Sequence, residues 1–134
     1  MHAKEYAKRY AQAEVTVAEP KRLLLLMLEG GVRFLHGARD GLAADDLPRF
    51  MYHSQKAQAV ISELLGTLDY EAGGEIARNL GRLYDFMLFH MTEGTARRSV
   101  RHYDEVLRLF ETIAGAYREV LNGPADASSK GVAA

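Results

Sequence analysis

Residues 20–44 read PKRLLLLMLEGGVRFLHGARDGLAA, and this stretch determines the predicted fold. Its apolar residues recur at steps of three and four, the spacing that places side chains on one face of an α-helix. They are Leu23, Leu26, Met27, Phe34, Leu35, Ala38 and Leu42. Pro20 stands at the first helical position, where a helix tolerates proline best. The stretch therefore predicts a helix of about six turns that ends near Asp45.

Three further apolar stripes follow, and no segment alternates between apolar and polar residues as a strand does. They predict helices over about 46–68, 74–93 and 99–121, with turns at 69–74 and 94–95. Asp45 and Asp46 suit the N-cap and first turn of the second helix, Ser99 suits the N-cap of the fourth, and Asn122-Gly123-Pro124 predicts a stop. Because short connections make consecutive helices antiparallel neighbours, we expect an all-α fold. It would be an antiparallel up-down four-helix bundle over 20–122, with a short N-terminal helical arm at 1–19 and a disordered tail at 123–134.

Composition excludes several classes of protein. The chain has 134 residues, 48% of them hydrophobic and 26% charged, which is typical of one globular domain. Its net charge of −1 gives no bulk attraction to nucleic acid. It has no cysteine, and its longest apolar run is far shorter than the roughly 20 residues that a membrane span needs. We therefore expect a cytoplasmic protein with neither nucleic-acid binding nor membrane insertion.

The usual signatures of a catalytic or metal site are missing from the sequence. Helical bundles often build metal sites from Glu-x-x-His pairs, yet no histidine here has an acidic residue three positions before it. No two histidines are four residues apart, and no glycine-rich phosphate loop follows a strand pattern. We expect no enzyme, no catalytic residue, no metal and no cofactor. Two alternatives stay open: a bundle enzyme that holds a cofactor or metal, and a structural homodimeric bundle.

The first core helix carries more apolar surface than one bundle face can bury. Residues 23–28 read LLLLML, and six consecutive residues surround a helix completely. The excess could pack on a second side of the bundle, or be covered by the N-terminal arm, a second subunit or an incoming apolar helix. Gly30-Gly31 follows in the same helix at a cost of roughly 2 kcal/mol relative to alanine. It indicates close helix packing or, less favoured, a slot for a partner's backbone.

Three stretches carry a resemblance to a known family. Tyr10 is followed by residues 15–34, VTVAEPKRLLLLMLEGGVRF; residues 56–64 read KAQAVISEL; and residues 73–87 read GGEIARNLGRLYDFM. In this order the three stretches resemble the flagellar secretion chaperone FliS family. Glu19 and Glu29 depart from the family's pattern, which has a small hydroxyl residue at the first position and commonly an aromatic or aliphatic residue at the second.

The resemblance implies a function and a site. It implies a cytoplasmic export chaperone that binds the disordered C-terminal segment of flagellin, prevents premature polymerisation, and delivers flagellin to the flagellar type III export apparatus. Its partners would be that segment and a component of the export gate, with a homodimer possible. We expect an apolar client-binding groove, and an N-terminal arm that folds back over part of the same surface as a plug. The expected groove residues are Leu24, Leu25, Leu28, Leu65 and Leu68, and the arm residues are Tyr6, Tyr10 and Val15.

Overall fold

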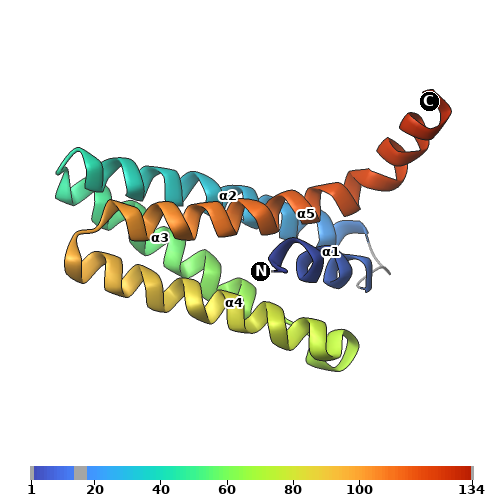
Figure 1. Cartoon of the computed structure of the whole chain (residues 1–134), viewed down its shortest axis with the longest axis horizontal. Helices are drawn as coiled ribbons and strands as arrows, with labels where there is room; N and C mark the ends of the chain where they lie inside the picture. Colours follow the sequence, from blue (N-terminus) through green and yellow to red (C-terminus); the bar gives the residue numbers. More distant parts are fainter. Residues whose placement is uncertain (1, 14–17, 134) are drawn as a thin grey trace.

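A computed structural model describes residues 2–13 and 18–133 of the chain, and the side-chain surroundings of residues 2–12 and 22–121. Every element in these ranges is an α-helix: α1 (Ala3–Ala13), α2 (Ala18–Ala43), α3 (Leu47–Gly66), α4 (Tyr70–Arg97) and α5 (Val100–Ala133). Helices α2 to α5 alternate in direction, and α1 lies at one end between α4 and α5 (Figure 1). The predicted all-α bundle with a short N-terminal helix is confirmed.

Aromatic side chains from different helices meet in the core. Phe50 of α3 packs edge-on against Tyr103 of α5, with ring centroids 5.2 Å apart. The buried Tyr103 hydroxyl lies 2.8 Å from the Ser54 hydroxyl of α3 and 2.8 Å from the Thr95 hydroxyl of α4. A buried polar group is tolerated when it is hydrogen-bonded, and this cluster fixes three helices at one level. The bundle is therefore held in register by a polar contact inside an apolar core.

The predicted N-caps of two helices are present. The Asp46 side chain accepts a hydrogen bond from the Arg49 N–H at 3.2 Å at the start of α3. The Ser99 hydroxyl accepts one from the His102 N–H at 3.2 Å at the start of α5. Each bond satisfies one of the backbone donors that a helix leaves unpaired at its first turn.

The segment predicted as a turn at 69–74 is mostly helical. The Asp69 side chain accepts from the Ala72 N–H at 3.0 Å, so the capped helix α4 starts at Tyr70 instead of near 74. The irregularity is confined to Gly74, whose φ of 52° and ψ of −129° kink α4. Glycine adopts this left-handed φ without the steric penalty that a side chain brings.

The predicted break at 94–95 is wrong, because α4 continues to Arg97. Gly94 is buried where α5 approaches, and a Cβ added there would lie 2.7 Å from the Cβ of His102. The glycine thus permits a close helix contact and does not interrupt the helix. The turn comes at Arg98, whose φ of 50° reverses the chain before α5.

Helix α5 extends beyond the predicted stop. It runs to Ala133, past Asn122-Gly123-Pro124, although the sequence predicts its end near 121. A proline inside a helix removes one hydrogen bond and can bend the helix rather than end it. The last part of α5 bends away from the other helices (Figure 1). Whether residues 123–134 are disordered in solution stays a prediction.

Candidate functional site

The apolar run at residues 23–28 divides between core and surface. Leu28 is fully buried, and Leu24, Leu25 and Met27 are partly buried against the core. Leu23 and Leu26 remain 63% and 58% exposed. The apolar surface of residues 23–28 that the bundle leaves exposed therefore belongs mainly to Leu23 and Leu26. Neither leucine is among the five expected groove residues.

The five predicted groove residues do not form one exposed surface. Leu28 belongs to the core, and Leu24 and Leu25 are partly buried against the core. Leu65 and Leu68, from the end of α3 and the turn after it, lie beside α4: a Cβ added at Gly81 would be 3.7 Å and 3.4 Å from their Cδ1 atoms. Whether any of the five contacts a client stays a prediction.

The exposed leucines belong to a longer apolar surface, the α2 face, which consists of Leu23, Leu26, Met27, Gly30 and Phe34. The spacing of these residues places them within about one third of the helix circumference. At its far end Phe34 reaches α3, where its ring centroid lies 6.3 Å from that of His53. The α2 face thus starts at two exposed leucines and ends where Phe34 meets α3.

The two consecutive glycines of α2 have different surroundings. A Cβ added at Gly31 would lie 2.6 Å from ring atoms of Phe110 and 3.2 Å from Val60, so Gly31 allows α3 and α5 to approach closely. A Cβ at Gly30 would meet only the Arg33 Nη2, at 3.7 Å. Close packing therefore explains Gly31 and does not explain Gly30. Gly30 is buried near the end of the Arg33 side chain, in the middle of the α2 face.

Glu29, the charged departure from the family pattern, points away from the α2 face. Its carboxylate lies 3.6 Å from the Arg118 Nε on α5. The Glu29 charge is therefore paired on the side of α2 that faces α5, away from the α2 face.

The described part of the N-terminal arm forms α1. It packs against α4 and α5. Whether it covers part of a client-binding surface stays a prediction. The buried residues of α1 are Ala3, Ala7, Tyr10 and Ala11. The small side chains of the three alanines let α1 lie close to two helices at once, and this fit favours the observed position of the arm.

Of the three arm residues singled out, Tyr10 makes the clearest contact. Its hydroxyl accepts a hydrogen bond from the Asp69 N–H at 2.7 Å. Its ring passes close to Gly73, where an added Cβ would lie 3.0 Å from two ring carbons. Tyr6 is partly exposed and packs edge-on against His2, which precedes the helix, while Val15 lies outside the described residues.

Ion pairs add to the docking of α1. Lys4 and Lys8 both lie 3.2 Å from the Glu119 carboxylate of α5. Hydrogen bonds from Lys8 and then Lys4 lower the pKa of Glu119 below its ordinary value. The three side chains are between 42% and 61% exposed, so water and salt screen these contacts strongly.

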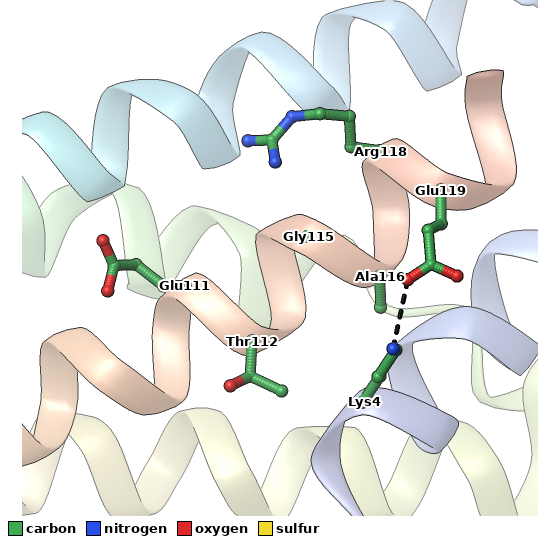
Figure 2. Close-up of a pocket in the computed structure, with 7 residues that line it drawn as sticks. All are labelled: Lys4, Glu111, Thr112, Gly115, Ala116, Arg118 and Glu119. Carbon is green, nitrogen blue, oxygen red and sulfur yellow. Dashed lines mark ion pairs between the residues drawn. The ribbon is translucent and has the colours of Figure 1, made fainter. Parts of the chain in front are cut away.

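A shallow depression of about 540 Å³ lies beside these ion pairs, between α1 and α5 (Figure 2). Charged and small residues line it: Lys4, Glu111, Thr112, Gly115, Ala116, Arg118 and Glu119. Ligand pockets in proteins are mostly enclosed, whereas this depression is open to solvent. The depression offers no catalytic grouping and lies apart from the α2 face.

Two observations concern the described ranges only. No helix there is both long and apolar enough to cross a membrane. No three histidine, cysteine, aspartate or glutamate side chains there gather closely enough to hold a metal ion.

The fold and the site define a helical bundle with an apolar helix face and a docked N-terminal helix, an arrangement suited to binding another polypeptide. Comparison with known proteins identifies the family. The profile of the family described as flagellar protein FliS matches residues 2–124. The chain therefore belongs to the FliS family, as the sequence resemblance indicated.

Several characterised relatives share this similarity over most of their length. The flagellar secretion chaperone FliSB of Pseudomonas aeruginosa is 35% identical over 113 residues, covering 81% of this chain and 90% of the relative. The flagellar secretion chaperone FliS of Salmonella typhimurium is 32% identical, covering 87% of each chain. The protein of that name from Campylobacter jejuni is 29% identical, covering 84% and 88%. The family is one of flagellar export chaperones and not of enzymes, which confirms both of these expectations.

Proposed function

We propose that this chaperone works in the cytoplasm, where it binds the disordered C-terminal segment of flagellin, prevents premature polymerisation and hands flagellin to the export gate. The observation that carries this proposal is the α2 face, where Leu23 and Leu26 stay exposed beside Gly30. A client helix would cover the two leucines and bring its backbone close to α2 at the glycine. The family membership supports the choice of a flagellar client.

The physical properties of such a client suit this surface. A disordered segment can wrap a large apolar surface, but it loses conformational entropy when it becomes helical. That loss consumes several kcal/mol of the interaction energy, so binding is specific and still reversible. An export chaperone needs specific binding to select its client and reversible binding to release it.

We propose that α1 occupies a second part of the client's binding surface, between α4 and α5. Its 11 residues are too few for a stable isolated helix, so its helicity depends on docking. The docked face buries three alanine methyl groups, which contribute about 2 kcal/mol together, and the ring of Tyr10. A client with larger apolar side chains would bury more area in the same place and displace α1.

Titration with a synthetic C-terminal flagellin segment tests the proposal. Calorimetry at several temperatures should show a negative ΔCp of binding, and circular dichroism should show more helix in the mixture than in the separate components. A scrambled segment of the same composition is the control. No heat and no gain of helix at about 50 µM of each component would contradict the proposal.

Deletion of residues 1–17 tests the role of the arm separately. If α1 competes with the client, its removal should strengthen client binding, because docked molecules no longer lower the apparent affinity. Unchanged affinity, with the bundle still folded by circular dichroism, would show that α1 and the client occupy different surfaces.

A further inference from the structure

Two exposed arginines lie along one edge of the α2 face. Arg22 and Arg33 are 11 residues apart, which is close to three helical turns, so they lie on one line along α2, next to Leu26. The rise of an α-helix separates their Cα atoms by about 16 Å along the axis. We call these two arginines the basic edge, and they border the apolar surface over most of its length.

The charges of the basic edge are not compensated within the described ranges of the chain. No carboxylate there forms an ion pair with the guanidinium group of Arg22 or Arg33. The expected partner of Arg33 within α2 is Glu29, four residues earlier on the helix. Glu29 instead lies 3.6 Å from the Arg118 Nε of α5. Both guanidinium groups can therefore accept a carboxylate from a bound partner.

The guanidinium group of Arg33 lies near the middle of the α2 face. A Cβ added at Gly30 would be 3.7 Å from its Nη2 atom. A client helix that approaches α2 at Gly30 would therefore remove water from this guanidinium group. Desolvation of a charged group without a partner is costly, whereas an ion pair with a carboxylate compensates much of that loss. A client that places a carboxylate beside Gly30 avoids the cost.

The other charges around the α2 face leave the basic edge dominant. Glu29 and Arg118 compensate each other. On α3, Val60 packs towards α2, and the exposed Lys56 and Glu63 lie on the same side of α3 as Val60 by helix geometry. The charges of Lys56 and Glu63 are opposite in sign. The surroundings of the α2 face are therefore positive overall because of the basic edge.

Given the proposed binding of a client at the α2 face, on which this inference rests, we propose that the basic edge determines client specificity. It selects a client helix that carries carboxylates beside its apolar stripe, about three turns apart. Arginine suits this role because its planar guanidinium group can donate two parallel hydrogen bonds to one carboxylate. The exposed leucines bind apolar helices of any charge, whereas the basic edge disfavours a helix with cations at the same positions.

A double-mutant cycle tests the inference. The protein variants are Arg33→Gln and the double substitution of Arg22→Gln with Arg33→Gln. The second ligand is the synthetic C-terminal flagellin segment in which Asn and Gln replace every Asp and Glu. With the unmodified segment, Arg33→Gln should raise the Kd by about threefold to tenfold, and the double variant should raise it by about tenfold or more. With the amide segment, both variants should bind within about twofold of the unmodified protein.

Arg101→Gln on α5 is the matched control. Arg101 is also exposed and forms no ion pair in the described part of the chain, but it lies at the start of α5, away from the α2 face. Its substitution should leave the Kd unchanged with either segment. A rise in salt from about 0.05 M to about 0.5 M should weaken binding by the unmodified protein more than binding by the double variant. Circular dichroism confirms the fold of each variant.

The outcomes separate client specificity from client binding itself. If the unmodified protein does not bind the unmodified segment, the proposed function is contradicted and the inference falls with it. If the segment binds with the same Kd to the unmodified protein and to both arginine variants, the inference alone is overturned. An equally large loss of affinity with the amide segment would also overturn it, because the arginines would then act through packing or through the client's backbone carbonyl groups.

Discussion

The hydroxyl of Tyr10 on α1 accepts a hydrogen bond from the backbone N–H of Asp69 at 2.7 Å. Asp69 is also the N-cap of α4, so this bond joins the N-terminal helix to the start of a core helix. Backbone donors at a helix start lack partners within the helix. Docking of α1 therefore gives one backbone N–H at the start of α4 a hydrogen-bond partner. Release of α1 would expose that N–H to water.

Substitution of Tyr10→Phe should weaken the docking of α1 while leaving most molecules docked. The variant keeps the buried ring and loses the bond to Asp69, which contributes about 1 kcal/mol to docking. Hydrogen exchange of the amides of α1 should become about fivefold faster, since the undocked population rises by that factor. If α1 competes with the client, the affinity for the flagellin segment should rise by up to the same factor. Exchange rates identical to those of the unmodified protein would show that the bond does not hold the arm.

Docking of α1 should depend on pH through Glu119. The pKa of Glu119 is lowered in the docked state by hydrogen bonds from Lys8 and Lys4. A lowered pKa stabilises docking above the pKa of the free carboxyl group, about 4.3, and this stabilisation is lost as the pH falls through the lower docked value. Proteolysis within α1 should therefore increase below about pH 4 and should also increase with salt at neutral pH.

The variant Glu119→Gln separates this effect from general acid unfolding. At pH 7 it should already show the faster cleavage of α1, with little further dependence on salt. Glu63→Gln, which changes an exposed glutamate on α3, is the matched control and should behave as the unmodified protein does. Equal cleavage of all three proteins at pH 7 would mean that the lysine pairs with Glu119 do not contribute to docking.

The two consecutive glycines of α2 should respond in opposite ways to alanine. Gly31→Ala places a Cβ against Phe110 and should lower the free energy of unfolding by about 1–3 kcal/mol. Gly30→Ala meets only the end of Arg33 and should raise the free energy of unfolding by about 0.5–1 kcal/mol. Gly30→Ala should nevertheless weaken client binding, because a client backbone could no longer approach α2 as closely.

Gly66→Ala provides the control for this pair. A Cβ there would meet nothing within 4 Å, so the change should alter helix propensity alone and leave client affinity unchanged. Urea unfolding and client titration of the three variants together provide the measurement. If Gly30→Ala is more stable and binds the client as tightly as before, the result would contradict the proposal that the client backbone approaches α2 at Gly30.

The sequence predicted the helices because the periodicity of apolar residues is a local property. It did not predict which apolar side chains are exposed, because exposure depends on how the helices pack together. The run at residues 23–28 showed that apolar surface would be left over. Which leucines remain exposed depends on the directions from which α3 and α5 approach α2. No local pattern contains that information, so the sequence did not separate Leu23 and Leu26, which remain exposed, from Leu24 and Leu25, which are partly buried.

The effect of a glycine within a helix likewise depends on tertiary packing and cannot be predicted from the local sequence. A glycine in a helical pattern indicates either a break or a close contact, and the local sequence is the same for both. Gly74 does kink the chain, while Gly94 is buried against His102 of the next helix. The position of the arm was likewise decided by the fit of its alanines to α4 and α5, which is a property of the assembled bundle.

The most direct measurement compares client affinity after one change on the α2 face with that after an equivalent change elsewhere. Fluorescence anisotropy with a labelled C-terminal flagellin segment yields the dissociation constants of the unmodified protein, Leu26→Glu and Leu47→Glu. Leu47 is also an exposed leucine, 44% accessible at the start of α3. Leu26→Glu should weaken binding at least tenfold, because it buries a charge against an apolar client, while Leu47→Glu should stay within about twofold. Equal affinities for all three proteins would show that the client does not bind the α2 face.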